Sequence, residues 1–473
     1  MKWLISKPLF WVLLICLGVS FTAANRYRWR GNAALEILAA DGVGYYSYLP
    51  ATFIYDDPTF EYYKEINKKY RNRDDWGHFM TLLDGKMLNK YYYGESILVA
   101  PTFFIAHGIA HVAQLDADGY SKPYQIAMVA ASVLWVMIGL YWLYRFLIHF
   151  VSRRTAAISV GLIYGGTNLF YYTIFEPSAS HPYSFALIAG FIYFGYQSIQ
   201  RKSHASYWKV ALILALTIVV RPSNALIVLA LPALAGSWSA FVVWVRHSLT
   251  IKTWLPAITM LVLLIFPQAW FYKQQTGHWW VYAYGEEKFH FDQPHFWQVL
   301  AGFRVGLLIY SPIIILAVIG LVRLIRQYRF TGIWLSVFLF GNIWLISCWW
   351  MWHYEGTFGM RPLIDHLAWW GLPLALLLQS ATKYGRQGLL ILAAFFVIVC
   401  QIQAFQRFQA IIPWSNMNFQ KYKYVFLNKS RIHAHLFTDK DFPDFPEKPT
   451  GIFFKNIHDE NPHSHDGILM VKE

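Results

Sequence analysis

The chain has 473 residues, of which 56% are hydrophobic, 19% aromatic and only 14% charged, and its mean hydropathy is +0.33. These values exclude an ordinary soluble globular protein and indicate an integral membrane protein. The net charge of +14 does not point to nucleic acid, because Lys and Arg fall in short clusters between apolar runs and form no continuous basic face. Cys16, Cys348 and Cys400 have no C-x-x-C spacing and indicate neither a disulfide framework nor a zinc site.

Apolar runs of membrane-spanning length begin near the N-terminus. A hydrocarbon core about 30 Å thick needs about 20 apolar residues per helix. The chain starts with basic and then apolar residues, which also fits a signal peptide. No clear small-x-small cleavage site followed by a soluble domain is seen, so we predict a retained helix over 8–24. The later predicted spans are 97–115, 126–150, 155–175, 184–199, 205–220, 225–243, 253–273, 304–325, 331–350, 367–381 and 388–406.

Basic residues recur in every second predicted loop, which is the pattern of cytoplasmic loops in membrane proteins. The cytoplasmic set is Lys2/Lys7, Arg153/Arg154, Arg201/Lys202/Lys209, Arg246/Lys252, Arg323/Arg326/Arg329 and Lys383/Arg386. The alternate loops then face the periplasm of an inner membrane. A full crossing by 97–115 would invert this order, so we expect about eleven crossings, with 97–115 dipping into or lying along the outer leaflet.

These patterns predict an all-α polytopic membrane protein with a bundle of about 11–13 transmembrane helices over 1–406. The bundle contains a first periplasmic loop, 25–96, and a second one, 274–303, and a small periplasmic tail follows over 407–473. Within the first loop, FEYYKEINKKYRNRDDW (60–76) places Tyr62, Tyr63, Ile66 and Tyr70 on one helical face. Aromatic side chains of this kind suit the headgroup zone, so we expect the loop to lie on the membrane surface.

DGVGYYSYLP (41–50) places an acid close behind the first predicted span. A carboxylate at the rim of an apolar bundle is partly desolvated, which is expected to raise its pKa and make it a usable proton acceptor. Gly42 and Gly44 allow a close backbone approach, and Tyr45 and Tyr46 are candidates to line a pocket. The alternative is that Asp41 only caps a helix, since Asp-Gly is also a common turn.

EPSASHPYSF (176–185) brings an acid, hydroxyls and a histidine into one turn at the membrane edge. Pro177 and Pro182 break the flanking helices there. Glu176 and His181 are therefore candidate pocket residues, although a histidine at a helix end is commonly structural.

Arg221, Arg304 and Arg361 lie at predicted outer helix ends, on the side that holds few other basic residues. An arginine near hydrocarbon needs a partner or a use. Its guanidinium fork binds phosphate oxygens in pairs and keeps its charge, so a phosphate site is predicted, most strongly at Arg361, with Glu355 and Asp365 nearby in sequence. Snorkelling to lipid headgroups is the alternative.

Two segments rich in aromatic residues, 274–303 and WWMWHYEGTFGMR (349–361), mix rings with acids and histidines. Sugars stack on aromatic faces while carboxylates accept from their hydroxyls, but an interfacial aromatic belt has the same composition. The candidate pocket residues in these segments are Tyr284, Glu286, His353 and Glu355.

The sequence has no P-loop, G-x-G-x-x-G, EF-hand or H-E-x-x-H motif, so no nucleotide, metal or other cofactor is predicted, although a divalent metal stays open. Acids, arginines and aromatic rings gathered at one rim suit a phosphate-bearing lipid whose head group reacts outside. A transporter or flippase of lipid-linked sugars is the alternative function, and its expected mark is charged residues near mid-membrane. A polymerase or ligase of surface glycans would have the same geometry and differ from this enzyme only in its acceptor. A structural scaffold is the poorest alternative, because it would not need arginines near the lipid boundary.

The motifs DGVGYYSYLP, KYYYGESILVAPTFF, SHPYSF, VRPSN, WWVYAYGEEKFHF, GFRVGLLIYSP, EGTFGMRPLID and WSNMNFQKYKYVF are spread over most of the chain. Together they resemble the GT-C superfamily of polytopic glycosyltransferases. The resemblance is greatest to the branch of protein O-mannosyltransferases and of the lipid A aminoarabinose transferase, in the form common in Bacteroidetes.

The resemblance implies an enzyme that takes a sugar from a polyprenyl-phosphate donor at the periplasmic face and transfers it, with inversion, to a protein, lipid or glycan. It also implies that Asp41, which matches the acidic position in the family's first loop, accepts the acceptor's proton. Arg361, with Arg304 or Arg221, would then stabilise the phosphate. Many relatives carry paired acids where this chain has Asp-Gly, so we expect no metal.

Overall fold

The computed structural model describes residues 8–72, 77, 79–83, 85–285, 287–354, 356–413 and 417–428. The regular elements of this part of the chain are helices, apart from one antiparallel hairpin in which β1 (Met80–Leu83) pairs with β2 (Lys86–Asn89). Within it, six helices are long and apolar enough to cross a membrane: α2 (Pro8–Tyr27), α6 (Gly94–Val112), α7 (Lys122–Leu147), α14 (Ile251–Thr276), α18 (Arg329–Ser347) and α20 (Lys383–Phe408). The predicted all-α membrane class is thereby confirmed.

Shorter elements complete the fold. The first half of the chain adds η1 (Gly31–Leu35), α3 (Asp41–Tyr46), α4 (Tyr48–Phe53), α5 (Tyr63–Arg71), α8 (Arg153–Gly165), α9 (Leu169–Ile174), α10 (His181–Arg201) and α11 (His204–Val220). The second half adds η2 (Pro222–Ala230), α12 (Leu231–Ala235), α13 (Trp238–Ser248), α15 (Phe296–Ala301), α16 (Leu307–Tyr310), α17 (Ile313–Gln327), η3 (Arg361–Trp370), α19 (Gly371–Ser380) and α21 (Phe419–Val425).

Several predicted spans are not single helices, and this corrects the sequence interpretation. The run 225–243 divides into η2, α12 and α13, because Pro232 starts a new helix and Gly236 adopts a φ of 76° between two of them. The run 155–175 divides into α8 and α9 at Gly165 and Gly166. The run 304–325 divides into α16 and α17 at Pro312, and 367–381 begins inside the 3₁₀ helix η3. Apolar composition alone does not show these interruptions.

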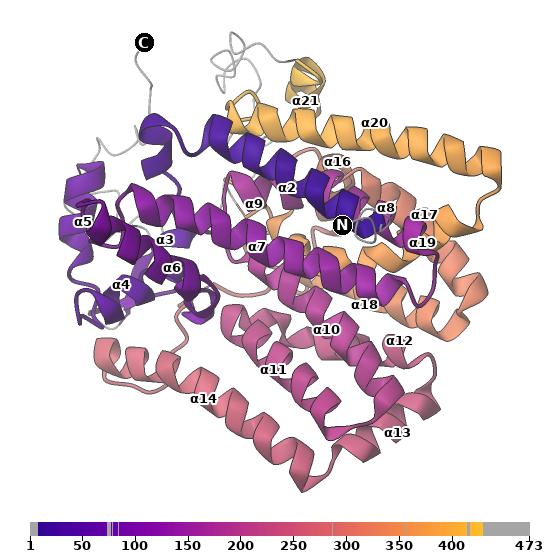
Figure 1. Cartoon of the computed structure of the whole chain (residues 1–473), viewed down its shortest axis with the longest axis horizontal. Helices are drawn as coiled ribbons and strands as arrows, with labels where there is room; N and C mark the ends of the chain where they lie inside the picture. Colours follow the sequence, from indigo (N-terminus) through magenta and orange to yellow (C-terminus); the bar gives the residue numbers. More distant parts are fainter. Residues whose placement is uncertain are drawn as a thin grey trace.

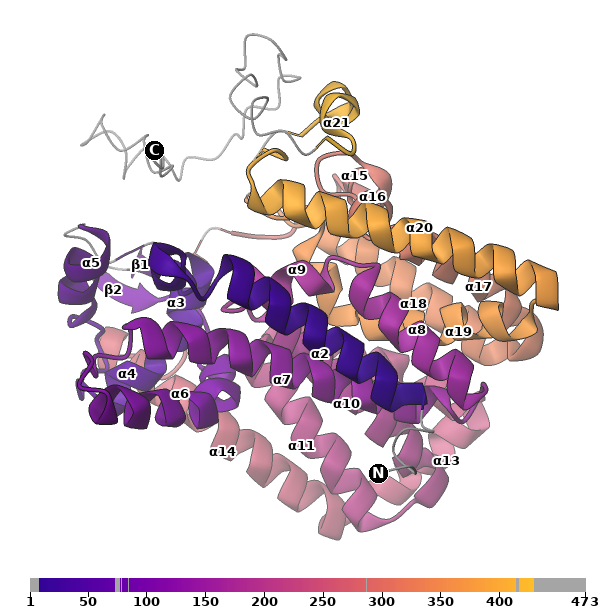
Figure 2. The ribbon, with the colours of Figure 1, turned by 45° about the horizontal axis from the view of Figure 1, so that its top comes forward.

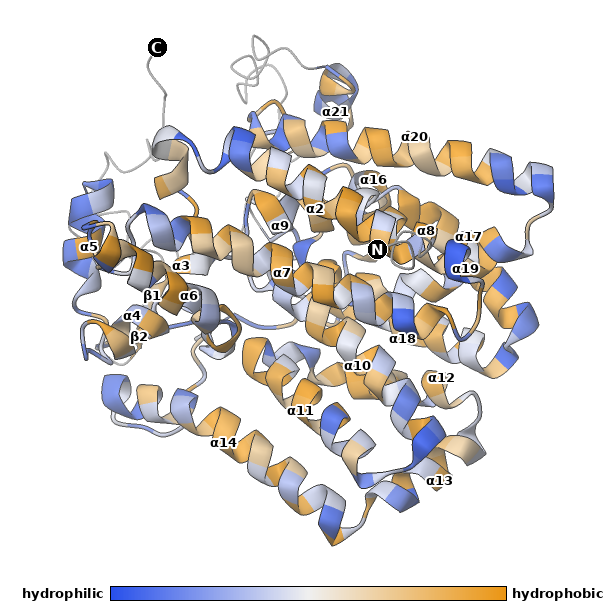
Figure 3. Ribbon diagram, viewed as in Figure 1, coloured by the Kyte–Doolittle hydropathy of each residue, from blue (hydrophilic) through white to orange (hydrophobic). Residues whose placement is uncertain are grey.

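The elements of the first loop gather at one end of the long helices. Figures 1 and 2 show α3, α4, α5 and α6 at that end and α13 at the other, with α7 and α10 running between them. Hydrophobic residues dominate the middle of α7, α14 and α20, whereas α5 is largely hydrophilic (Figure 3). The most extensive helix contact joins α7 to α10, and nearly every residue of α10 from His181 to Tyr193 is buried. This pair forms the centre of the core.

Helix α6, which covers most of the predicted segment 97–115, is bonded to the first loop near its start, as is the turn that follows it. The Ser96 hydroxyl donates to the Tyr45 carbonyl at 2.6 Å. In the turn after α6, the Tyr120 hydroxyl lies 3.0 Å from the Ser47 hydroxyl. These contacts fasten the start of α6 and the following turn to one short segment of the first loop.

Helix α5 forms inside the predicted amphipathic segment 60–76 and begins and ends a few residues inside it. Tyr63 and Ile66 are buried, and Tyr62 and Tyr70 are partly buried, so the expected face packs inward. The Tyr70 hydroxyl donates to Asp118 at 2.6 Å, which fastens α5 to the turn after α6. The first loop is therefore a packed layer over the helix ends.

Candidate functional site

Asp41 is the first residue of α3, and the two following glycines bring this helix against its neighbours. A Cβ atom on Gly42 would lie 2.1 Å from the Ser178 Oγ atom. A Cβ atom on Gly44 would lie 2.3 Å from the Tyr91 ring. Real Cβ atoms do not approach so closely, so only glycine fits both positions. The predicted close approach of the backbone is confirmed, and it places Asp41 beside the turn 176–181.

Gly42→Ala is expected to destabilise the protein by about 1–3 kcal/mol, because the new methyl group overlaps Ser178 in a packed interface. Thermal unfolding in detergent measures the effect as a lower midpoint. Gly108→Ala in α6 is the matched control: nothing lies within 4 Å of its added Cβ, so helix propensity should make it neutral or stabilising by about 0.5–1 kcal/mol. Equal midpoints for the two variants would contradict the close packing of α3.

Asp41 and Arg361, 320 positions apart in the sequence, form an ion pair. The Arg361 Nη2 atom lies 2.9 Å from Asp41 Oδ2, and the Tyr91 hydroxyl donates to Asp41 Oδ1 at 2.6 Å. The Asp41 side chain keeps 32% of its surface exposed. Burial raises the pKa of Asp41, but Arg361 and the Tyr91 hydrogen bond outweigh it, so the pKa lies below its ordinary value. Asp41 is an ionised and accessible carboxylate.

A second group is centred on Asp365, which is buried on η3. One carboxylate oxygen accepts from His181 Nδ1 at 2.7 Å, and the other accepts from Asn224 Nδ2 at 2.8 Å and lies 3.1 Å from Arg221 Nε. Burial raises the pKa of Asp365, but His181 and Arg221 lower it further, so it lies below its ordinary value. Arg221 also donates to the Ser180 hydroxyl at 3.2 Å. Two predicted residues, His181 and Arg221, thus meet at one unpredicted acid.

Glu176 lies close to the ion pair, in the turn that Gly42 contacts. Burial raises its pKa, and the neighbouring Arg407 and Arg361 only partly oppose this effect. Arg407 comes from the end of α20 and donates to the Gly356 carbonyl at 2.5 Å. A carboxyl group whose pKa is raised near one whose pKa is lowered gives the site two acids of different strength.

The segment after α14 closes another side of the site. Lys90 Nζ forms an ion pair with Glu287 at 2.6 Å and lies 5.2 Å from the centre of the Tyr284 ring. Tyr284 also interacts electrostatically with Tyr45 and Arg221, so it belongs to the same group. The acid held here is Glu287, whereas the predicted Glu286 lies outside the described residues, as does Glu355.

The remaining predicted residues lie in three different places. Arg304 lies over the Trp352 ring, 5.9 Å from its centre, and His353 is buried nearby, where burial followed by the charge of Arg304 lowers its pKa to about 4. Tyr45 packs against Tyr91 with ring centres 4.8 Å apart, at the Asp41 group. Tyr46 instead donates to the Gly119 carbonyl at 2.5 Å inside the first loop.

Sequence reasoning did not select Tyr91, Asn224, Asp365, Lys90 or Glu287 as site residues. A signal existed for Asp365, which follows Arg361 by four residues. It also existed for Tyr91, in the motif KYYYGES. Lys90 stands in the same motif and Asn224 in VRPSN, but neither was selected, because a polar residue near a predicted span has many structural uses.

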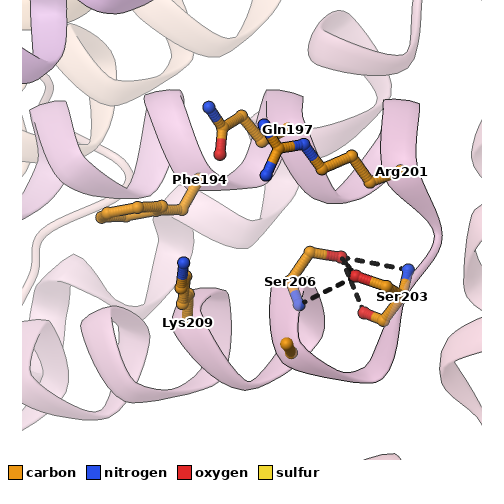
Figure 4. A pocket seen from close by; sticks show the side chains of 7 residues that line it. Phe194, Gln197, Arg201, Ser203, Ser206 and Lys209 are labelled. Carbon is orange, nitrogen blue, oxygen red and sulfur yellow. Dashed lines mark hydrogen bonds between the residues drawn. The ribbon is translucent and has the colours of Figure 1, made fainter.

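No three His, Cys, Asp or Glu side chains in the described ranges are grouped so that they could hold a metal ion. A small pocket does form elsewhere, where α10 ends and α11 begins. Figure 4 shows its lining by Phe194, Gln197, Arg201, Ser203, Ser206 and Lys209, with Ala205. Because α10 rises about 1.5 Å per residue, the pocket residues on this helix lie about 20–30 Å from His181, and the pocket is separate from the Asp41 group.

No family model matches this chain, and no curated protein matches it. Among solved structures, ArnT from Cupriavidus metallidurans in the apo state is similar to this chain. The similarity covers 80% of this chain and 70% of that one, with a TM-score of 0.45 and 11% sequence identity.

Proposed function

We propose that this membrane protein is a glycosyltransferase that moves a sugar from a polyprenyl-phosphate donor to an acceptor at the periplasmic face of the inner membrane. The observation that supports it best is the Asp41–Arg361 contact at 2.9 Å. An accessible carboxylate beside a guanidinium offers a proton acceptor and a phosphate ligand within one side-chain length. That pairing is what the displacement of a phosphate by a hydroxyl requires.

In the proposed reaction, an acceptor hydroxyl attacks the anomeric carbon and gives its proton to Asp41. The bond from that carbon to the phosphate oxygen breaks, and its electron pair stays on the polyprenyl phosphate. Arg361 stabilises the charge that grows there, because its guanidinium has donors beyond the one that Asp41 uses. Attack opposite the leaving phosphate inverts the anomeric configuration.

The other cations take secondary roles in this proposal. Arg221 already balances Asp365, so it supports the phosphate site through its field and its contact with Ser180. Arg304 and His353 are assigned to the outer part of the pocket near Trp352. Tyr45 and Tyr284 line the pocket beside Asp41, and Glu176 lies below them as a second acid.

The direct test is an assay with purified protein in detergent. A panel of undecaprenyl-phosphate-linked hexoses and pentoses is incubated with the protein and a bacterial envelope extract as the source of acceptors. Release of undecaprenyl phosphate from one donor, with radiolabelled sugar passing to the extract, is the expected result. Transport of intact donor across proteoliposome membranes without release would instead support the flippase.

A further inference from the structure

The arrangement around Asp365 fixes the state of His181. A carboxylate that carries Arg221 as its counter-ion only accepts hydrogen bonds, so the His181 Nδ1 atom, 2.7 Å away, carries a proton. Arg221 balances the charge of Asp365, and the histidine side chain, which is 4% exposed, is neutral beside it. In a neutral imidazole the second nitrogen, Nε2, then holds a lone pair.

The turn that leads into His181 packs on the helix that begins at Asp41. Gly42 is pressed against Ser178, and Arg221 binds Ser180, so the turn before His181 packs on the start of α3. His181 and Asp41 also interact electrostatically. Among the described residues, Nε2 has no hydrogen-bond partner, and the Tyr172 ring lies edge-on to the imidazole at 5.9 Å. The Nε2 atom of His181 is thus a basic nitrogen within electrostatic range of Asp41, the proposed proton acceptor.

We propose that His181 is a second proton acceptor in the transfer and that Asp365 is its positioning residue. This inference rests on the proposed function. The acceptor's proton goes first to Asp41 and then to Nε2 of His181, which becomes imidazolium while Asp41 returns to a carboxylate. No bond to carbon or phosphorus changes in this step, and the histidine later gives the proton to water or to the released phosphate.

The surroundings lower the proton affinity of both groups. Arg361 and Tyr91 stabilise the ionised form of Asp41, so Asp41 holds a proton poorly. Burial opposes a positive charge on His181, Asp365 at 2.7 Å stabilises it, and Arg221 and Arg361 oppose it, so the pKa of His181 falls to about 4. The imidazole takes the proton because Asp41, whose pKa is lowered from 3.8, holds it still more weakly. A buried carboxylate that accepts from one imidazole nitrogen holds the histidine in a single tautomer and orientation, as in other enzymes that use histidine as a base.

The test compares variants in the undecaprenyl-phosphate release assay across pH. His181→Asn keeps an N–H for Asp365 but has no basic nitrogen, so the rate should fall about 10²-fold and the acid limb of the pH profile should move to lower pH, where Asp41 alone is protonated. His181→Ala leaves a space, and added imidazole should restore part of its rate in a concentration-dependent way. This second variant keeps the proposal testable if the asparagine variant does not fold.

His247→Asn is the matched control, because it makes the same substitution at an exposed histidine of α13, at the other end of the long helices from α3. It should keep the wild-type pH profile. An active wild type whose rate and acid limb are unchanged by His181→Asn, or a His181→Ala variant that imidazole does not rescue, would overturn the role of His181 alone. A wild type that releases no undecaprenyl phosphate from any donor would overturn the proposed function as well.

Discussion

Asp41→Asn is expected to lower the transfer rate by about 10³-fold, within the range that a single general base supplies. The amide keeps the size of the side chain and can still accept from Tyr91, but it cannot take a proton or pair with Arg361. Because Asp41 lies at the start of α3 with a third of its surface exposed, the fold should survive. Release of undecaprenyl phosphate, measured beside the thermal midpoint in detergent, checks both statements.

Asp56→Asn is a suitable control for this experiment. Asp56 belongs to the same loop, is exposed, and has a φ of 49°, which asparagine also tolerates. It should retain full activity. If Asp41→Asn and Asp56→Asn transferred sugar equally well, Asp41 would have no part in the chemistry.

Arg361→Ala is expected to lower kcat/KM for the donor by about 10²–10³-fold, as the loss of a charge-stabilising donor does in other enzymes. The KM for the donor should rise more than that for the acceptor, because the guanidinium is assigned to the phosphate. Titration of the variant with donor and with acceptor separates the two. Equal losses on both substrates would be evidence against a phosphate contact, and Arg329→Ala, at an exposed helix start, should change neither.

The same variant should also change the pH dependence. Arg361 is the strongest influence that lowers the pKa of Asp41, against burial, which raises it. Without Arg361 the pKa rises, and since the base works only when ionised, activity should be lost at a higher pH as the solution is acidified. Arg361→Lys retains the positive charge but loses the paired N–H donors of the guanidinium. Its pH profile should therefore be closer to that of the wild type than its affinity for the donor is.

The class of the fold could be predicted from sequence because membrane-spanning helices leave long apolar runs. Their continuity could not, since the breaks at Pro232, Gly236 and Pro312 occur within equally apolar stretches. The short hairpin β1–β2 was also missed, because four-residue strands in a polar loop have no clear alternation.

Sequence reasoning selected individual residues of the candidate site but did not predict most of the contacts between them. Asp41 and Arg361 were each selected for lying at an outer helix end, and their convergence was expected from topology and from the resemblance. The link from His181 through Asp365 to Asn224 depends on the 3₁₀ winding of η3, which turns Asp365 inward. Sequence periodicity assigns such a segment no definite face.

The lipid-facing side of α6 has a consequence for the depth of the reaction. Phe104, Ile105, Ile109 and Val112 are exposed on this helix, and its start and the turn after it are fastened to the layer that holds Asp41. A bilayer that surrounds these side chains would therefore set the height of α3 above the bilayer centre. A thinner or thicker membrane would shift that height against the headgroup of a lipid-borne substrate, so hydrophobic mismatch becomes a control on catalysis.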